Sequence, residues 1–473
     1  MAYNPRMNDA TNSGPADLAI IGGGAAGVMT ALQALRQSRR PLRVRLFEAA
    51  STLAEGIAYA TPSPVHLLNV PAGRMSALPD VPGDFADYLQ QIGAYPDDDR
   101  ATLEARFASR LHYAPYLRQR LAEAAQGHAA TLEVVQQPVL SLHRAPGGGL
   151  QLATAGGGRY AARQAVIACG NNVRPLPLRG AARLPAERVA EAWDYDGVRL
   201  LAGTQAIGII GSGLSMVDSV LSLFDAGHHG AIHVFSRHGL MPLPHAHGAP
   251  AQFDPQPLLA LPLRQRVRFL RERAREAAAH GIPWQSVMER IRPLGQSLWL
   301  SLDAADQRRF LRHVVRQWDV HRHRIDARVH ARLIEALREG RLQLQRARLQ
   351  GVDAQDGELL LQAHTASGER AWALGALVNA TGVETRAAQL RNPLLRQLLD
   401  EGLARPGPHG LGLDSAVADA CLLDSHGHPQ ADLRVLGSLR IGTLWESLAV
   451  PELRQQAHDA AYRALHELDA AIP

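Results

Sequence analysis

The sequence predicts an α/β protein in which one strand–turn–helix–strand unit occurs twice. Three observations predict this fold. A glycine-rich turn follows an apolar run at residues 18–27 and again at 206–218, an apolar helical run follows each turn, and a second apolar run ends each unit at 44–48 and at 232–237. Such a βαβ unit places the N-terminus of a helix next to the carboxyl end of a buried strand.

The first copy has the spacing of a dinucleotide-binding turn. Gly22 allows a tight turn, Gly24 lets a pyrophosphate approach the backbone, and Gly27 lets helix and strand pack closely. Glu48 ends the second strand, where a carboxylate would bind two ribose hydroxyls, so we expect a nucleotide with a free ribose, such as FAD or NAD. The expected contacts are Gly22, Gly24, Ala25, Ala26, Gly27 and Glu48.

The second copy departs from the first at two points. Met216 replaces the third glycine, and the strand that closes the unit ends in Ser236 and Arg237 where the first copy has an acid. A hydroxyl and a guanidinium suit a 2′-phosphate, which favours NADPH over NADH, although Met216 leaves open a degenerate unit that binds nothing. The expected contacts are Gly211, Ser212, Gly213, Leu214, Ser215, Ser236 and Arg237.

Each copy is followed by residues that alternate like strands and end in glycine. These stretches cover 131–168 and 342–378, and the glycines after them, Gly170 and Gly382, are expected close to the cofactors. We expect an FAD-binding domain at 17–202, an NAD(P)H-binding domain at 203–382 with a helical insertion at about 253–338, and a return to the FAD-binding domain at 383–473. The arginines at 264–275 form either a solvated face paired with glutamates or a basic rim around an anionic ligand.

Composition excludes several classes of chemistry. The chain contains no lysine, which excludes a Schiff base or a P-loop lysine, and its two cysteines, Cys169 and Cys421, form no CxxC motif. The net charge of +5 is thinly spread, so no nucleic-acid partner is expected. No metal site is predicted, and no apolar stretch is long enough to span a membrane, so we expect a cytoplasmic protein without a membrane partner.

Several long motifs resemble the YdhS-like FAD/NAD(P)-binding proteins. The run His-Leu-Leu-Asn-Val-Pro-Ala-Gly-Arg-Met-Ser at 66–76 and the run Gly-Thr-Leu-Trp-Glu-Ser at 442–447 are two of them. Further matches lie at 56–62, 110–113, 211–218, 236–240, 318–324 and 448–454. The resemblance covers nearly the whole chain and implies a flavoprotein with two dinucleotide sites, related to the N-hydroxylating flavin monooxygenases.

The resemblance also implies roles for two loops. The loop from Asn69 to Ser76 would line the flavin, and Trp445 and Glu446 would contact the substrate just before a helix that starts near Ser447. Flavoprotein reductases usually have an acid where this chain has Ser438, so the segment from Gly437 to Leu444 would contact the flavin through its backbone. The candidate catalytic residues are Asn69, Arg74, Trp445 and Glu446, and the further cofactor contacts are His66, Met75, Gly437, Thr443 and Leu444.

Two alternatives remain at these loops. The loop at 69–76 would serve equally well as packing for the ADP half of the cofactor, and Trp445 and Glu446 as a core aromatic and a capping acid.

The sequence thus predicts an FAD-dependent, NADPH-using monooxygenase that oxidises a small amine or amino acid with molecular oxygen through a flavin hydroperoxide. Two alternatives are a flavin reductase or oxidase that releases peroxide and a non-catalytic FAD-binding partner protein. Nothing in the sequence indicates the oligomeric state.

Overall fold

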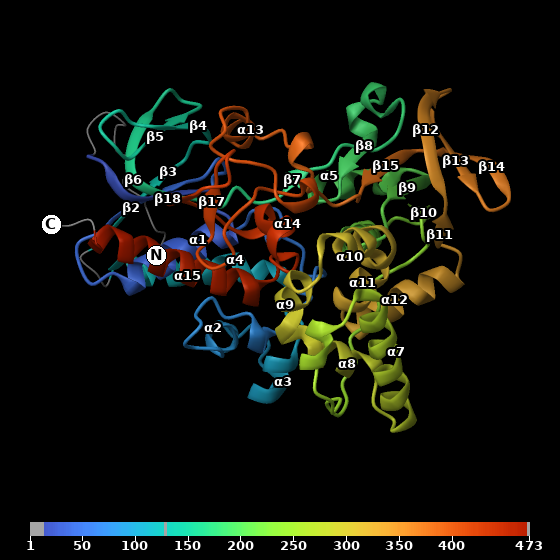
Figure 1. The fold of residues 1–473 in the computed structure, drawn as a ribbon. Coiled ribbons are helices and arrows are strands. Elements are labelled where there is room, and N and C mark those ends of the chain that lie inside the picture. Colours follow the sequence, from blue (N-terminus) through green and yellow to red (C-terminus); the bar gives the residue numbers. More distant parts are fainter. Residues whose placement is uncertain (1–13, 127–129, 471–473) are drawn as a thin grey trace. The chain divides into compact units, whose positions relative to one another are not determined.

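The computed structural model describes residues 14–126 and 130–470, and these residues form two compact units (Figure 1). Unit 1 is drawn from residues 1–62, 70–172 and 384–473, and unit 2 from residues 63–69 and 173–383. Two short strands, β7 (Asn172–Val173) and β16 (Val383–Glu384), lie where the chain leaves unit 1 and where it returns. The chain also leaves unit 1 for the seven residues 63–69, which no sequence signal predicted.

Unit 1 contains a sheet with the strand order β17-β18-β6-β1-β2-β3, in which β18, β6, β1, β2 and β3 are parallel. Its strands are β1 (Ala16–Ile21), β2 (Arg43–Phe47), β3 (Thr131–Val135), β6 (Arg159–Ile167), β17 (Cys421–Leu423) and β18 (Pro429–Val435). The hairpin strands β4 (Val139–Arg144) and β5 (Leu150–Thr154) pair antiparallel with each other, and β5 pairs with β6. The alternating stretch at 131–168 therefore divides between the parallel sheet and a hairpin.

Helices cover this sheet because its central strands are apolar on both faces. Alternate residues of β1, such as Ala19 and Ile21, pack in one cluster with Leu394 and Leu398 of α13 (Pro393–Asp400). The fully buried Val28 and Leu32 lie on α1 (Ala25–Gln37), which packs against α4 (Tyr113–Gln126) and α15 (Val450–Ala470). The remaining helices and helical turns are α2 (Asp84–Gln91), α3 (Arg100–Ala105), α14 (Ile441–Leu444), η1 (Ala72–Arg74), η2 (Arg110–His112), η9 (Ala387–Gln389), η10 (Pro408–Gly410) and η11 (Gly437–Arg440).

Unit 2 contains a fully parallel sheet with the order β11-β10-β9-β15-β8. Its strands are β8 (Val189–Glu191), β9 (Ala206–Ile210), β10 (Ala231–Ser236), β11 (Leu342–Arg346) and β15 (Ala376–Asn379). A separate antiparallel sheet holds β12 (Arg348–Gln355), β13 (Glu358–Thr365) and β14 (Gly368–Leu374). Because β8 pairs with β15, residues 173–202 belong to unit 2, whereas the sequence placed the boundary after residue 202.

The helices of unit 2 include a long insertion between β10 and β11. They are α5 (Tyr195–Leu200), α6 (Leu214–Asp225), α7 (Leu263–Ala279), α8 (Trp284–Ile291), α9 (Gly295–Leu300), α10 (Ala304–Arg309), the π-helix η8 (Phe310–Val314), α11 (Val315–Arg322) and α12 (Ala327–Arg338). Helical turns lie at η3 (Ala181–Arg183), η4 (Ala186–Arg188), η5 (Leu201–Gly203), η6 (Gln256–Ala260) and η7 (Arg292–Leu294). The buried Leu258, Met288 and Ile291 form an apolar cluster of the insertion.

The arginines of α7 divide between surface and core. Arg268 and Arg273 form surface ion pairs with Glu272 and Glu276, as the solvated-face interpretation expects. Arg266 is buried, and its guanidinium donates to the carbonyl oxygens of Leu259, Leu261, Leu298 and Ser301. Arg266 therefore holds the insertion together, which neither interpretation of the arginine run anticipated.

Candidate dinucleotide-binding sites

The first glycine turn leaves no room for a side chain at two of its three positions. Gly22 has φ +107°, its N–H donates to the Phe47 carbonyl oxygen at 2.8 Å, and a Cβ there would lie 2.3 Å from the carbonyl oxygen of Ala168. A Cβ on Gly27 would lie 1.8 Å from the Gly22 carbonyl oxygen. A Cβ on Gly24 would meet nothing closer than 3.7 Å. The fold thus requires glycine at 22 and 27, whereas a Cβ at position 24 would make only an ordinary van der Waals contact with Gly56.

The helix that follows this turn offers free backbone donors. Gly24 is the N-cap of α1 and supplies no side chain to cap it, and the first turn contains no acid. The first N–H groups of a helix have no partners within the helix, so the amides of Ala25 and Ala26 suit an anionic ligand. Three predicted contacts, Gly24, Ala25 and Ala26, therefore lie together at one positive helix end.

The carboxylate of Glu48 lies beside this turn. Its Oε2 accepts the N–H of Gly23 at 2.6 Å and its Oε1 accepts the N–H of Ala50 at 2.9 Å. The side chain is half-buried, and each oxygen retains a second lone pair for a hydroxyl donor. The two backbone bonds fix the carboxylate at the position where the sequence predicted a ribose contact.

The second turn repeats the backbone contacts of the first. Gly211 has φ +109° and donates its N–H to the Phe235 carbonyl oxygen at 2.9 Å. A Cβ on Gly211 would lie 2.2 Å from the carbonyl oxygen of Ala380, and a Cβ on Gly213 would meet nothing within 4 Å. Unit 2 therefore contains the same tight turn as unit 1, and its second glycine has more free space around it than Gly24 has.

Met216 changes the start of the helix without changing the turn. In α1 the N–H of Val28 donates to the Gly24 carbonyl oxygen at 2.9 Å, whereas in α6 the equivalent bond from Val217 to Gly213 is 3.4 Å long. In α6 the N–H of Met216 also donates to the Gly213 carbonyl oxygen at 3.1 Å, a bond of the 3₁₀ type, and the Met216 side chain is buried in the core of unit 2. Ser212 uses its hydroxyl to donate to the Leu240 carbonyl oxygen, so only its backbone is available to a nucleotide.

Three arginines gather near the end of β10. Arg237 is exposed and makes no ion pair or hydrogen bond within the described chain, while Arg346 pairs with Ser236 in the register of β10 and β11. Burial lowers the pKa of His238, and the charges of Arg237, Arg316 and Arg346 lower it further. Arg346 is a candidate ligand that the sequence analysis missed, because only strand pairing brings it beside Ser236.

The segment 63–69 belongs to unit 2. The ring of His66 is fully buried, and its Nε2 lies 2.9 Å from the Ser222 hydroxyl and 3.1 Å from the Asp218 carbonyl oxygen of α6. His245 donates to the carbonyl oxygen of Asn69 at 3.2 Å, and burial, aided by Arg324, lowers the pKa of His245 to about 4. We therefore expect His66 to hold this segment on α6, while a cofactor contact for Asn69 stays a prediction.

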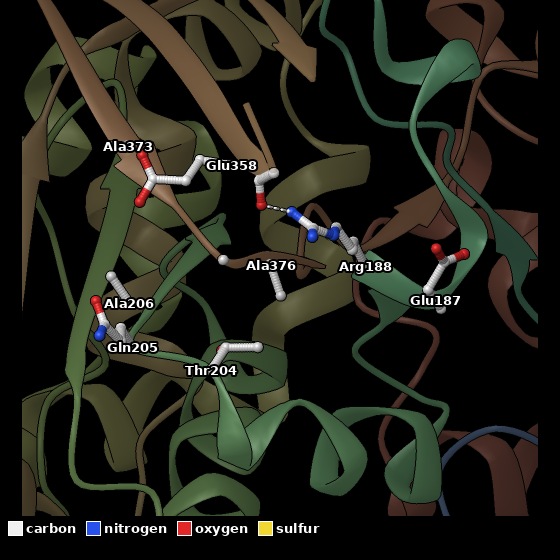
Figure 2. Close-up of a pocket in the computed structure, with 10 residues that line it drawn as sticks. Glu187, Arg188, Thr204, Gln205, Ala206, Glu358, Ala373 and Ala376 are labelled. Carbon is white, nitrogen blue, oxygen red and sulfur yellow. Dashed lines mark hydrogen bonds between the residues drawn. The ribbon is translucent and has the colours of Figure 1, made fainter. Parts of the chain in front are cut away.

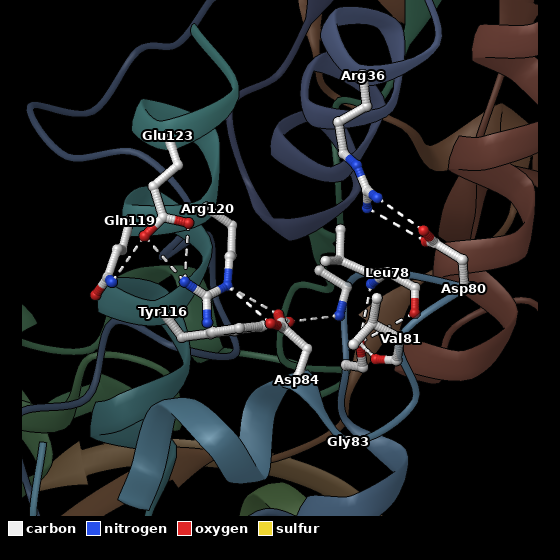
Figure 3. Close-up of polar contacts among 12 residues, drawn as sticks. Arg36, Leu78, Asp80, Val81, Gly83, Asp84, Tyr116, Gln119, Arg120 and Glu123 are labelled. Carbon is white, nitrogen blue, oxygen red and sulfur yellow. Dashed lines mark hydrogen bonds and ion pairs between the residues drawn. The ribbon is translucent and has the colours of Figure 1, made fainter. Parts of the chain in front are cut away.

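The neighbouring loop of unit 1 is fixed by polar contacts with α4, as Figure 3 shows. Tyr116 accepts the N–H of Ala77 at 2.8 Å and donates to Asp84 at 2.6 Å, and Arg120 pairs with Asp84 at 2.9 Å. Burial, together with Asp84, raises the pKa of the Tyr116 hydroxyl.

The predicted contacts of this loop lie just before that network. Arg74, the last residue of η1 (Ala72–Arg74), is exposed, and Met75, which follows it, is buried. The guanidinium of Arg454 on α15 donates to the Ser76 carbonyl oxygen at 3.0 Å. The loop is thus held at its C-terminal side from two helices.

The C-terminal segment of unit 1 contains a strained turn. Trp445 has φ +60° and ψ −65°, and the N–H of Glu446 donates to the Leu444 carbonyl oxygen at 2.7 Å. This is a γ-turn of the rare strained type, which costs about 1–3 kcal/mol. Helix α15 begins at Val450, close to the start expected near Ser447.

Other predicted contacts lie around this turn. Ser438, which replaces the usual acid, donates its hydroxyl to the carbonyl oxygen of Gly170 at 3.0 Å. Thr443 and Glu446 are buried, and Gly437 has φ +70°. Gly382, the predicted glycine after β15, belongs to unit 2 and is not part of this segment; it has φ +85°.

The thiols of both cysteines have a raised pKa. The Sγ of Cys169 lies 3.8 Å from the Ile21 carbonyl oxygen, and burial, with the charge of Glu48, raises the pKa of this thiol to about 12. Burial also raises the pKa of the Cys421 thiol to about 12.

A cleft of about 320 Å³ lies at the opposite end of the unit 2 sheet from the glycine turn (Figure 2). It is lined by Thr204, Gln205 and Ala206 before and at the start of β9, by Ala376 of β15, and by Arg188, which donates to the Gly357 carbonyl oxygen. Ligands of parallel sheets bind outside the carboxyl ends of the strands, and this cleft is at the amino ends. We therefore assign it no part in nucleotide binding.

Within residues 14–126 and 130–470, no three histidine, cysteine, aspartate or glutamate side chains are placed to share a metal ion. No helix of the described chain is both long and apolar enough to cross a membrane.

Comparisons with known proteins support the architecture. Residues 19–172 match the model of a family described as FAD-NAD(P)-binding. No curated protein sequence matches the chain.

Similar solved structures include the ornithine hydroxylase of Pseudomonas aeruginosa, with 18% identity, a TM-score of 0.66 and coverage of 96% of this chain and 100% of that one. The L-lysine 6-monooxygenase of Pseudomonas syringae has 19% identity, a TM-score of 0.64 and coverage of 97% and 100%. The ornithine N-hydroxylase of Kutzneria sp. 744, solved with reduced FAD, NADP+ and L-ornithine, has 15% identity, a TM-score of 0.61 and coverage of 96% and 100%. The chain therefore has the α/β fold of these enzymes over nearly its whole length.

The turn geometry predicts that one glycine substitution lowers stability and another lowers FAD affinity. Gly27→Ala places a Cβ against the Gly22 carbonyl oxygen and should destabilise the protein by about 1–3 kcal/mol. Gly24→Ala should leave the apparent Tm almost unchanged but weaken FAD binding, because its Cβ would clash with nothing in the protein yet would lie where the pyrophosphate approaches the backbone. Thermal unfolding of the FAD-free variants and titration with FAD measure both effects. Equal losses of Tm in the two variants would contradict this division of roles.

The raised thiol pKa values predict slow reaction with a disulfide reagent. At pH 8 a thiol with a pKa of about 12 is about one part in ten thousand thiolate, so the folded protein should react very slowly. Because these pKa values are raised, the rate should still be increasing at pH 10, where an ordinary thiol has reached its plateau. Unfolding should release two fast-reacting thiols. A thiol that reacts fast at pH 8 in the folded protein, assigned with Cys169→Ser, would contradict the prediction.

Proposed function

We propose that this chain is an FAD-dependent, NADPH-using oxidoreductase, a monooxygenase that oxidises a small amine or amino acid with molecular oxygen. The observation that carries the proposal is the repeated glycine turn, which has the same backbone contacts at Gly22 and at Gly211. Two dinucleotide sites in one chain suit a flavin and a nicotinamide, whose reactive rings must exchange a hydride.

We assign FAD to unit 1. The match of residues 19–172 to an FAD-NAD(P)-binding family supports this assignment. The open backbone at Gly24 and the amides of α1 would hold the pyrophosphate, and Glu48 would accept hydrogen bonds from the ribose. The segment from Gly437 to Leu444 would contact the flavin half. FAD, when bound, supplies the redox chemistry that the side chains themselves lack.

We assign NADPH to unit 2. Arg237 and Arg346 lie beside Ser236 at the carboxyl end of β10, where the second strand of a βαβ unit meets the ribose of a nucleotide. Guanidinium groups bind phosphate through charge-assisted hydrogen bonds, so the 2′-phosphate of NADPH is the ligand that this cluster fits best.

Two features favour oxygen as the electron acceptor. The chain has two cysteines and no CxxC motif, and burial raises the pKa of both thiols to about 12, which disfavours a protein dithiol as the acceptor of electrons from the flavin. The similar structures named as ornithine and lysine hydroxylases match this chain from end to end. A small amine or amino acid is therefore the substrate class that we propose.

An anaerobic experiment tests the proposal. We expect NADPH to bleach the absorbance of bound FAD much faster than NADH does. When air is then admitted in the presence of the substrate amine, we expect a hydroxylated product in place of peroxide. The assay should be run over a panel that contains ornithine, lysine and cadaverine. Peroxide equal to the NADPH consumed with every amine would indicate an oxidase. If NADPH does not reduce FAD with any of the amines present, the chain would be a non-catalytic FAD-binding protein.

The arginine cluster predicts a selective effect on the coenzyme. Arg237→Ala and Arg346→Ala should each raise the KM for NADPH by about 10- to 100-fold, because each removes a charged hydrogen bond to the 2′-phosphate. The KM for NADH should change little. Arg348→Ala, which removes an exposed arginine at the start of β12, is the matched control. Equal changes in the KM for NADPH and the KM for NADH would contradict the assignment of these arginines to the 2′-phosphate.

A further inference from the structure

One glutamine side chain of α15 bonds to both ends of the C-terminal segment 437–447. The N–H of Gly437 donates to Oε1 of Gln456 at 3.2 Å, and Nε2 of Gln456 donates to the carbonyl oxygen of Ser447 at 3.0 Å. Gln456 is buried, with 6% of its surface exposed. A buried amide whose donor and acceptor are both used sets the separation of the two groups that it joins.

The strained turn at Trp445 lies between these two ends. A strained backbone persists only where its surroundings determine the conformation. Trp445 donates its N–H to the Ile441 carbonyl oxygen at 2.9 Å, and a Cβ on Gly442 would lie 2.3 Å from the Leu411 carbonyl oxygen. The middle of the segment is thus packed closely, and Gln456 holds its ends.

Two buried hydroxyls of this segment have no partner. The Oγ1 of Thr443 and the Oγ of Ser447 are inaccessible and make no hydrogen bond to any described residue. Buried hydroxyls nearly always have a partner, and an unmade bond of this kind costs free energy. Two unmade bonds in so closely packed a segment indicate that the surrounding contacts, among them those of Gln456, impose its conformation.

We propose that Gln456 is a positioning residue for the flavin half of the cofactor, an inference that rests on the proposed function of unit 1 as the FAD site. By fixing Gly437 and Ser447, its amide holds the turn at Trp445 and, with it, the backbone from Gly437 to Leu444 that would contact the flavin. The ADP half of FAD would depend on the glycine turn at 22–27 and on Glu48, to which the Gln456 amide makes no hydrogen bond. Loss of the amide therefore weakens the binding of FAD and leaves that of ADP unchanged.

Gln456→Met removes both hydrogen bonds with little change in volume. The matched control is Gln455→Met, because Gln455 is an exposed neighbour on the same helix that bonds only to Asp459 one turn away. Dissociation constants of the FAD-free full-length protein are measured for FAD and for ADP, with the visible circular dichroism of the bound flavin. We expect Gln456→Met to weaken FAD binding about tenfold, to change the flavin spectrum and to leave ADP binding unchanged.

A second variant separates the two bonds. Gln456→Glu keeps the acceptor for Gly437 but its carboxylate cannot donate to Ser447, so its FAD affinity should lie between those of the wild type and Gln456→Met. If Gln456→Met does not fold, the FAD and ADP affinities of Gln456→Glu are compared with those of the control Gln455→Glu. Unchanged FAD affinity and spectrum, or equal weakening for FAD and ADP, would overturn the inference. A wild type that binds no FAD would instead overturn the proposed function.

Discussion

The close approach of a glycine turn to the end of a neighbouring strand determines the rest of this structure. At Gly22 the backbone passes so near the carbonyl oxygen of Ala168 that a Cβ would lie 2.3 Å from it, and at Gly211 the corresponding distance to Ala380 is 2.2 Å. Because the turn is that tight, the following helix begins directly at the carboxyl end of the central strand. Its unpaired N–H groups then form the anion site on which each candidate nucleotide site depends.

The C-terminal residues complete unit 1 from far along the chain. Strand β18 pairs in parallel with β6, and the fully buried Arg434 bonds to Gln164 at 2.7 Å and pairs with Glu467 at 2.6 Å. These contacts carry the segment from Gly437 onward into the same unit as the first glycine turn. The candidate FAD site therefore combines residues from both ends of the sequence, and Gln456 is the side chain that joins the two ends of its last segment.

Because the chain contains no lysine, its permanently charged basic side chains are all arginines. Some guanidiniums are structural: Arg266 bonds to four carbonyl oxygens, and Arg440, whose pKa burial lowers to about 10, bonds to Ser415 and to the carbonyl oxygens of Ala416 and Val417. Others, such as Arg237, remain exposed and unpaired in the described chain. The structural arginines differ from the exposed ones in their burial and in the carbonyl oxygens that accept their hydrogen bonds. The residue type is the same in both groups.

The sequence by itself determined the two βαβ units, the glycine positions and the acid at Glu48, because these depend on local backbone geometry and on short apolar periods. The tertiary structure decided what depends on distant partners. It placed β8 and the segment 63–69 in unit 2, buried His66 against α6, and brought Arg346 beside Ser236 through strand pairing. It also produced the strained turn at Trp445, whose conformation opposes local preference and needs the surrounding contacts to persist.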